Sequence, residues 1–402
     1  MNTYYIRTGP ANYKEVTLKA DAMSSGGEGS VYRLQGRDSW IPTGRKITKR
    51  ACAKIFNQGF LSKHGKMMEE KLMFMTTKDN VPRFLDDHND STNLFQLCWP
   101  MSLLYDAPNG NFVGFMMYYA LEDSVPLSTI TVQRSDNYFK MQERMGKLNR
   151  TEKDIYKKFE DPRSRMPFVY NIALVINYIH ALGHYVNGDI KPDNFLINAR
   201  GGVSLVDLNT VQVEAGRKFY PSFVATPDYV PPECQSNPTG KKAMSFDLFS
   251  MAVVFYQLLV GVHPFAYSVK GKNTIGTSIQ EHIRSGKFAC GKNRKSFTLS
   301  PQHQRFDMLP ESLKDLFQRA FEGPASRRPT ALEWVNTIKA IRSGAGTTNG
   351  MHAPAPRPAP APVAKPPMPK AAKKNNDKCP NCGTKYLTAS SRFCHVCRTP
   401  RP

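Results

Sequence analysis

A run of prolines limits most strongly what this chain can fold into. Residues 354–369 contain eight prolines in sixteen positions. Proline lacks a backbone N–H and fixes φ, so this run cannot form a helix or a sheet strand and should be extended polyproline II. It predicts a semi-rigid spacer, although a docking site for a proline-reading domain stays open as an alternative. We therefore expect a linker over residues 343–377, between a folded unit over residues 1–342 and a short module over residues 378–402.

Within the folded unit, the hydrophobic pattern changes near Leu121. Before it, apolar and β-branched residues predict strands, with one helix candidate at residues 67–76. The predicted strands are residues 31–34, 51–56, 96–104 and 112–119, with a hairpin turn at Asn109-Gly110 between the last two. After Leu121 the period becomes helical. The predicted helices are residues 167–182, 246–260, 311–321 and 330–341, and the last begins with a capping box of Thr330 and Glu333. This order predicts a bilobal α+β fold, with a small lobe over residues 1–120, a large lobe over residues 121–342 and a cleft between them.

Charge and cysteine usage narrow the class of partner and the compartment. The 402 residues carry 55 Lys and Arg against 33 Asp and Glu, a net charge of +22. Such a balance favours nucleotides, acidic proteins, nucleic acid or a membrane surface, without choosing among them. The first residues do not resemble a secretory signal, and the longest apolar run, residues 251–262, is too short to cross a bilayer. We expect a cytoplasmic protein without a membrane partner, its scattered cysteines reduced.

A glycine-rich segment comes immediately before the first predicted strand. Residues 24–31 read SSGGEGSV and match the pattern G-x-G-x-x-G-x-V at Gly26, Gly29 and Val31, with Ser24 in place of the first glycine. Glycines there allow the backbone to approach phosphates closely. A plain glycine-rich hairpin is the alternative. Because a strand follows the segment, it does not fit a Rossmann or Walker loop, both of which open a helix.

A lysine stands in the middle of an apolar strand. Lys54 lies in the sequence ACAKI, and burying its charge is costly without an anionic partner. The helix candidate offers Glu69 and Glu70, and we take Glu70 as the partner that holds Lys54 ready for phosphate oxygens. The pairing with Glu69, or a lysine whose amine simply reaches solvent, stays open.

The segment GDIKPDN at residues 188–194 carries the strongest chemical signal. Asn194 and Asp207, thirteen residues later, supply the oxygen ligands that Mg²⁺ or Mn²⁺ takes. Asp189 is then free to orient a hydroxyl and accept its proton. Lys191 can neutralise charge on a transferring group.

Together these motifs resemble the eukaryotic-type protein kinases, over roughly residues 10–342. Residues 226–233, TPDYVPPE, resemble the end of the kinase activation segment, and Arg328 resembles the late arginine that pairs with its glutamate, here Glu233. Lys191 and Thr226 are forms found in the serine/threonine group. The resemblance implies ATP- and Mg²⁺-dependent phosphorylation of protein substrates. A catalytically weak nucleotide-binding pseudokinase scaffold is the alternative.

A narrower resemblance concerns residues 99–120. This stretch is similar to bacterial signalling kinases encoded with phosphatase and von Willebrand-type partners in tellurium-resistance clusters. That resemblance implies a von Willebrand-type domain protein and a cognate phosphatase as partners.

Two departures from the kinase pattern bear on regulation. Asn187 and Gly188 stand where kinases have His-Arg, so no arginine clasps a phosphate on the activation segment. Activation by such phosphorylation is therefore not expected. The usual Asp-Phe-Gly is Asp207-Leu208-Asn209, in which Leu208 keeps an apolar plug and Asn209 is a residue type that tolerates a left-handed φ better than most. The lysine, the base and the metal-binding aspartate are all retained, which favours an active enzyme.

The C-terminal module contains two C-x₂-C pairs. Its cysteines are Cys379, Cys382, Cys394 and Cys397. Two such knuckles can complete a tetrahedral Zn²⁺ site, a zinc ribbon; disulfides or a redox pair are the alternatives. Seven basic residues surround the knuckles. We favour docking of a protein substrate over binding of nucleic acid, which would tether the kinase through the same basic residues.

Overall fold

The computed structural model describes residues 2–8, 12–36, 40–43, 47–82, 94–270 and 278–344. The chain divides into two compact units, residues 1–347 and 348–402. The proline run and the four cysteines of the expected zinc ribbon lie outside the described residues. In the part that the structure describes, no helix is long and apolar enough to span a membrane.

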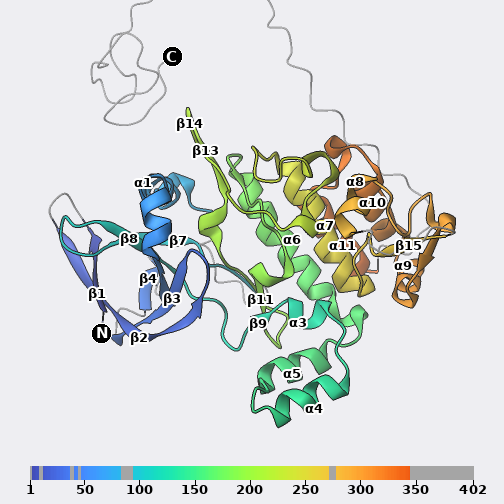
Figure 1. Cartoon of the computed structure of the whole chain (residues 1–402), viewed down its shortest axis with the longest axis horizontal. Helices are drawn as coiled ribbons and strands as arrows, with labels where there is room; N and C mark the ends of the chain where they lie inside the picture. Colours follow the sequence, from blue (N-terminus) through green and yellow to red (C-terminus); the bar gives the residue numbers. More distant parts are fainter. Residues whose placement is uncertain are drawn as a thin grey trace, which may run out of the picture. The chain divides into compact units, whose positions relative to one another are not determined.

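The first unit opens with a β-rich lobe, drawn in blue and teal in Figure 1. Its strands are β1 (Asn2–Arg7), β2 (Tyr13–Ser25), β3 (Gly29–Leu34), β4 (Trp40–Thr43), β5 (Ile47–Phe56), β7 (Pro100–Tyr105) and β8 (Phe112–Tyr118). They pair in the order β3-β2-β1-β7-β8-β5-β4, and β3 also pairs with β5, which closes six of them on themselves. The sequence patterns did not predict β1 and β2. The predicted turn between β7 and β8 is present, with Asn109 at φ 58°.

Alternation along β5 decides which of its side chains face the cleft. Ala51 and Ala53 belong to the small apolar cluster enclosed by the closed sheet. Cys52 and Phe56 belong to the main core on the other face. Because strand residues two apart point the same way, Lys54 shares the face of Cys52 and Phe56. That face looks toward helix α1 (Gln58–Met75).

Helix α1 begins nine residues earlier than the pattern predicts. The side chain of Asn57 accepts a hydrogen bond from the Phe60 amide and caps the helix. Gly59 and Gly65 lie in the first two turns and are poor helix formers, so the hydrophobic pattern did not predict this part of the helix. The side chains buried by α1 share one face: Met68, Lys71, Leu72 and Met75.

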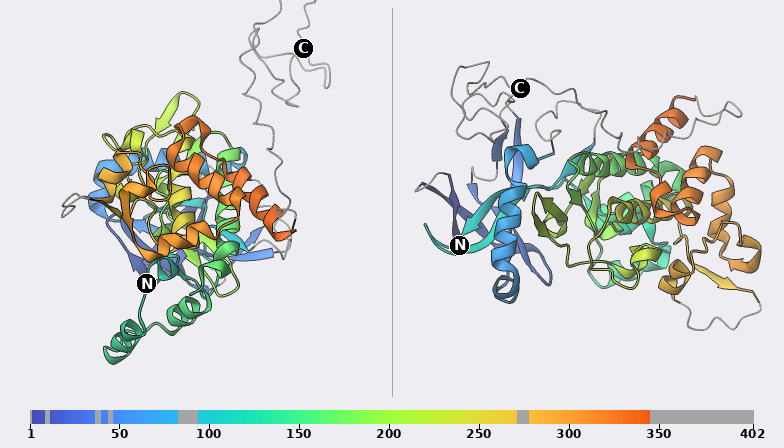
Figure 2. Two further views of the ribbon diagram at one scale, coloured as in Figure 1. Left: turned by 90° about the vertical axis from the view of Figure 1, so that its right-hand side faces the viewer. Right: turned by 90° about the horizontal axis from the view of Figure 1, so that it is seen from above.

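The large lobe is mainly helical, as predicted, and lies beside the β-rich lobe in the right-hand view of Figure 2. Its helices are α3 (Ser128–Thr131), α4 (Asp136–Arg144), α5 (Arg150–Lys158), α6 (Met166–Ala181), α7 (Met244–Val260), α8 (Ile279–Arg284), α9 (Gln304–Asp307), α10 (Glu311–Glu322) and α11 (Ala331–Arg342). Helix α7 is buried on almost every side, in agreement with its apolar sequence. The predicted capping box of Thr330 and Glu333 begins α11.

Short strands line the side of the large lobe that carries the candidate site. They are β6 (Phe95–Leu97), β9 (Val125–Pro126), β10 (Tyr185–Val186), β11 (Phe195–Ile197), β12 (Val203–Leu205), β13 (Gln212–Ala215) and β14 (Lys218–Tyr220). β15 (Tyr267–Val269) and β16 (Phe297–Leu299) form a separate two-stranded antiparallel sheet. β6 pairs in parallel with β12 of the large lobe. The single strand predicted over residues 96–104 is therefore wrong: it is two strands, one for each lobe.

Candidate active site

A buried carboxylate fixes the loop between β10 and β11. Asp247, at the start of α7 and fully buried, accepts hydrogen bonds from the backbone N–H groups of Asn187 at 2.7 Å and Gly188 at 2.8 Å. His180 Nε2 lies 2.9 Å from the same carboxylate. Gly188 has φ 76°, a conformation that favours glycine. The sequence placed Asp247 at the start of this helix but did not reveal that it holds the loop.

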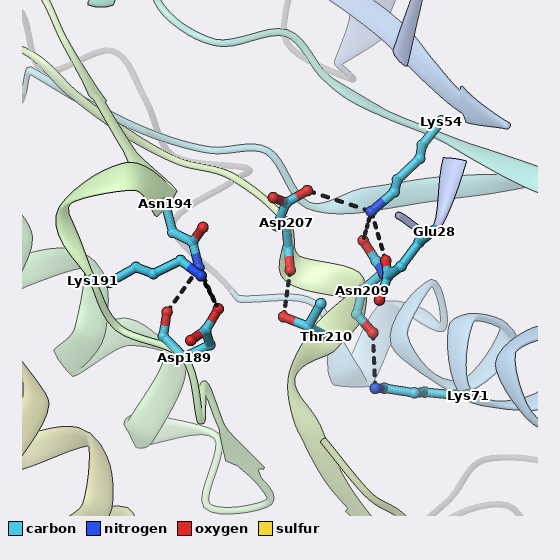
Figure 3. Close-up of polar contacts among 9 residues, drawn as sticks. All are labelled: Glu28, Lys54, Lys71, Asp189, Lys191, Asn194, Asp207, Asn209 and Thr210. Carbon is cyan, nitrogen blue, oxygen red and sulfur yellow. Dashed lines mark hydrogen bonds and ion pairs between the residues drawn. The ribbon is translucent and has the colours of Figure 1, made fainter. Parts of the chain in front are cut away.

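Three predicted residues meet around the Asp189 carboxylate: Lys191 and Asn194, which Figure 3 shows, and Thr226. The Thr226 hydroxyl donates to Asp189 Oδ1 at 2.7 Å, and Lys191 Nζ lies 2.8 Å from Oδ2 and 3.0 Å from Thr226 Oγ1. Asn194 Nδ2 donates to the Asp189 backbone oxygen at 2.7 Å and to Oδ2 at 3.1 Å. A carboxylate that already accepts from a hydroxyl and lies beside an ammonium group can take a hydroxyl proton.

Asp207 follows β12 in a left-handed conformation, at φ 57°. The 3₁₀ turn after it, Leu208–Thr210, returns hydrogen bonds from the Thr210 amide and hydroxyl to the Asp207 backbone oxygen. Asn209 itself does not have a positive φ. The turn begins one residue after Asp207, so the reversal of φ falls on the aspartate, which tolerates it well. Leu208 is buried, as expected of an apolar plug.

The oxygen donors on this side of the cleft fit a hard divalent cation. The side chain of Asp207 is about half exposed, at 47%. Asn194 uses its amide nitrogen to hold Asp189, and its amide oxygen is the atom that would bind a metal. Within the described ranges there is no cluster of three or more His, Cys, Asp or Glu that could hold a metal alone. A magnesium ion here would take its other ligands from nucleotide phosphates and water.

Lys54 is buried, and its partners differ from the predicted one. Its Nζ lies 2.8 Å from Glu28 Oε2, 3.0 Å from Asn209 Oδ1 and 3.4 Å from Asp207 Oδ1. Glu28 comes from the glycine-rich segment between β2 and β3. The predicted ion pair between Lys54 and Glu70 is therefore wrong.

The two glutamates of α1 point elsewhere. Glu70 Oε2 lies 2.8 Å from Nζ of Lys218 on β14, and Glu69 accepts a hydrogen bond from the Tyr105 hydroxyl at 3.0 Å. Successive residues of a helix are 100° apart, so the residue that faces the cleft is the next one, Lys71. The Lys71 ammonium is fully buried and donates to the Asn209 backbone oxygen at 2.8 Å.

Burial and charge pull the groups in this cluster in opposite directions. Burial alone would raise the pKa of Glu28, but the charge of Lys54 and hydrogen bonds from Lys54 and Asn209 bring it below its ordinary value. Burial lowers the pKa of Lys71 to about 7, although the charge of Glu28 opposes the shift. This cluster thus holds two carboxylates, Glu28 and the half-exposed Asp207, and two lysines, Lys54 and Lys71.

The glycines of the segment have different surroundings. A Cβ on Gly26 would meet nothing within 4 Å, which leaves room for a ligand. A Cβ on Gly29 would lie 2.1 Å from the backbone oxygen of Ile55, so the close approach of β3 to β5 requires a glycine at this position. Val31 stands opposite Lys54 in the β3–β5 register.

A buried lysine occupies the space next to Gly188. Lys242 Nζ donates to the backbone oxygens of Ser222 and Val224, each at 3.2 Å. A Cβ on Gly188 would lie 3.0 Å from Lys242 Cδ and from Ser222 Oγ. Burial lowers the pKa of Lys242, while the charges of Asp247 and Asp189 raise it. Lys242 therefore clasps the activation segment (residues 207–233) directly, a role that the sequence did not reveal.

The expected ion pair between Glu233 and Arg328 is present. Arg328 Nη2 lies 2.8 Å from Glu233 Oε2, and Nη1 also donates to the Ser245 backbone oxygen at 3.0 Å. The pair ties the end of the activation segment to the turn before α11.

Comparisons with known proteins agree with this geometry. Residues 121–338 match the protein kinase domain family. The chain is 24% identical to Protein kinase YegI of Escherichia coli (strain K12), over 341 residues that make up 82% of this chain and 45% of that protein. It is 33% identical to human Serine/threonine-protein kinase MRCK beta, over 170 residues that make up 40% of this chain and 9% of that protein.

The relative from E. coli O157:H7, also named Protein kinase YegI, is 24% identical over 365 residues, 87% of this chain and 48% of that protein. The chain thus spans about half the length of these bacterial relatives. The family match covers more than half of this chain and contains the Asp189 cluster, Asp207 and the Glu233–Arg328 pair. The chain therefore belongs to the protein kinase domain family.

Proposed function

We propose that the protein transfers the γ-phosphate of ATP to serine or threonine hydroxyls of protein substrates. The observation that carries the proposal is the contact at 2.7 Å between the Thr226 hydroxyl and the Asp189 carboxylate, with Lys191 beside both. A substrate hydroxyl next to Asp189 would meet the same carboxylate and the same ammonium group.

In the proposed reaction, the substrate oxygen forms a bond to the γ-phosphorus as the bond from that phosphorus to the bridging oxygen of ADP breaks. The hydroxyl proton goes to Asp189, and ADP leaves with the electron pair. Lys191 neutralises charge on the transferring group. Lys54 binds phosphate oxygens, and the open backbone around Gly26 gives the phosphates room.

Asp207 and Asn194 are the residues that would hold Mg²⁺ or Mn²⁺. A bound cation would screen the negative charge of the phosphates. Asn194 also holds the Asp189 carboxylate through its amide nitrogen, so it links the metal side of the site to the base.

The preference for serine or threonine rests on Lys191 and Thr226. The name of the human relative, Serine/threonine-protein kinase MRCK beta, points to the same specificity. Lys191 contacts both Asp189 and Thr226, and the short hydroxyl side chain of Thr226 lies next to the base. A serine or threonine of a substrate carries its hydroxyl on an equally short side chain and would reach Asp189 in the same way.

A phosphotransfer assay with γ-labelled ATP, a generic protein substrate and the Asp189→Asn variant tests the proposal. We expect incorporation by the wild type and a loss of roughly 10³-fold in the variant. Phosphoamino-acid analysis should find phosphoserine or phosphothreonine. Equal incorporation by both proteins, or none by the wild type with intact nucleotide binding, would favour the pseudokinase scaffold instead.

In this proposal, the four C-terminal cysteines form a zinc ribbon that docks protein substrates. The support is the spacing of Cys379, Cys382, Cys394 and Cys397 and the proline spacer before them. The partners include the substrate proteins and, through the likeness of residues 99–120, a von Willebrand-type protein and a phosphatase in the cytoplasm. Metal analysis of the full chain should find about one zinc, lost when the four cysteines become serine.

A further inference from the structure

Two lysines, Lys54 on β5 and Lys71 on α1, lie near one glutamate, Glu28. Protein kinases ordinarily hold the strand lysine with a glutamate of the helix. Here the helix presents a lysine, Lys71, toward the cleft, and the glutamate comes from the glycine-rich segment. Compared with the usual arrangement, the two charges have exchanged elements (Figure 3).

We propose that Glu28 is the residue that positions Lys54 for phosphate binding, and that Lys71 takes the place of the helix glutamate by fixing Asn209. This inference rests on the proposed phosphotransfer activity and names the residues that prepare its phosphate site. Glu28 and Lys71 act through Lys54 and Asn209, so both are positioning residues.

Asn209 connects Lys54, Glu28 and Lys71 through three hydrogen bonds. Its Oδ1 accepts from Lys54 at 3.0 Å, its Nδ2 donates to Glu28 Oε2 at 3.0 Å, and its backbone oxygen accepts from Lys71 at 2.8 Å. Asn209 is completely buried. Every one of these bonds except the last needs an amide side chain, which accounts for asparagine where most kinases have glycine.

The burial of Lys54 also supports Glu28 as its partner. The side chain of Lys54 is 8% exposed and that of Glu28 is 25% exposed. A buried ammonium group needs a close anion, and Glu28 lies 0.6 Å nearer to it than Asp207 does (2.8 Å against 3.4 Å). Asp207 is also the residue that would give its charge to a metal. Glu28 is therefore the anion left to hold the lysine when the metal binds.

The origin of Glu28 has a mechanical consequence. Its backbone oxygen accepts a hydrogen bond from the Asn57 amide, which begins α1, and Asn57 Nδ2 donates to the Gly27 backbone oxygen at 2.7 Å. The glycine-rich segment, the start of α1 and Lys54 are thus joined through Glu28 and its neighbours. The segment that covers the phosphates also sets the lysine that binds them.

The test compares full-length Glu28→Gln and Glu28→Asp with Glu70→Gln, a matched control in which the helix glutamate is neutralised. We expect Glu28→Gln to lower kcat by about 10²-fold and to weaken Mg·ATP binding, both measured at a temperature where the variant remains folded. Glu28→Asp should recover part of the loss, and Glu70→Gln should stay within about threefold of wild type.

The opposite ranking, a large loss in Glu70→Gln and wild-type behaviour in Glu28→Gln, would overturn the inference and return the role to the helix. If the wild type has no phosphotransfer activity, the proposed function fails, and titration with Mg·ATP still decides the inference. Weaker binding by Glu28→Gln alone would support it. Equal binding by wild type and Glu28→Gln would overturn it.

A double-mutant cycle with Lys71→Met tests the exchange itself. Methionine keeps the buried stem of the lysine and removes the charge. If Glu28 and Lys71 act through one network, Glu28→Gln/Lys71→Met should lose clearly less activity than the product of the two single losses. Losses that simply multiply would mean that Lys71 is unrelated to the position of Lys54.

Discussion

The Asp189 loop and the Lys54 site lie in the same cleft but differ in how their residues are brought together. In the loop, Asp189, Lys191 and Asn194 come from six consecutive residues, and the predicted group is assembled as expected. At Lys54, the partner comes from a segment 26 residues earlier in the chain, and the predicted helix glutamates point away.

This difference shows when a sequence motif is enough to predict the arrangement of side chains. A short loop held by Asp247 has few ways to arrange its side chains, so residue types and spacing suffice. A pair made between two elements depends on the rotation of a helix about its axis. One residue of rotation moves a side chain by 100° and exchanges Glu70 for Lys71.

Asp207→Asn should have the largest effect, because it weakens the metal site while asparagine still tolerates the left-handed φ. We expect kcat to fall by about 10³-fold in a Mg²⁺-dependent phosphotransfer assay. Asp193→Asn removes an exposed carboxylate from the Asp189 loop and serves as the control, with activity near wild type. A comparable loss in both variants would mean that general charge, and not the metal site, is being measured.

Lys242→Met should come next. It leaves the backbone oxygens of Ser222 and Val224 without their shared donor, and we expect kcat to fall by roughly 30-fold as the activation segment loosens. Lys241→Met, a neighbouring exposed lysine paired with Glu214, should change little. Normal activity in Lys242→Met would show that the segment is held by other contacts.

Glu233→Gln should destabilise the large lobe without altering the chemistry. It leaves Arg328, whose side chain is 3% exposed, without its carboxylate. We expect the free energy of unfolding to fall by about 2 kcal/mol, measured by urea denaturation. A change below about 0.5 kcal/mol would place this pair among the surface ion pairs of little worth.

Lys71 makes stability depend on pH. Its pKa of about 7 in the folded protein lies below that of the unfolded chain, so above about pH 7 the unfolded chain binds a proton that the folded one does not. Stability from this group therefore rises with pH and is lowest where both forms are charged. Glu28 opposes the shift, and Lys242 adds to it.

Between about pH 7 and pH 9, the free energy of unfolding of wild type minus that of Lys71→Met should increase by about 1 kcal/mol or more. Urea denaturation at several pH values measures it. A difference that does not change with pH would mean that Lys71 keeps an ordinary pKa.

The smallest effect is expected at the hydroxyls of the activation segment. Because Lys242 already holds the segment, Ser222→Ala and Tyr220→Phe should leave kcat within about threefold. If either change abolished phosphotransfer while nucleotide binding survived, activation would depend on phosphorylation of that residue.

Much of the fold could be predicted because apolar periodicity reports burial directly. Helices α7 and α11 follow their patterns, and Thr330 caps α11 as expected. The patterns missed β1 and β2, whose outward residues are mostly exposed, and the first half of α1, which contains two glycines. These elements are fixed by pairing and capping, which periodicity does not report.

Two features of the sequence indicated that the partner of Lys54 would be unusual. Lys71 falls on the same helical face as Met68 and Met75, three residues after one and four before the other, so its burial could have been expected. Glu28 is a carboxylate in a segment that approaches phosphates, where like charge would repel. Neither signal decides which lysine meets which glutamate, because that depends on the distance between two separate elements.

A crystal structure of the full chain with Mg²⁺ and a non-hydrolysable ATP analogue tests the exchanged charges most directly. The account predicts that Lys54 Nζ contacts a phosphate oxygen while Glu28 stays about 3 Å from it and Lys71 stays on the Asn209 backbone oxygen. A structure in which α1 has turned, so that Glu69 or Glu70 holds Lys54 and Glu28 points to solvent, would contradict it.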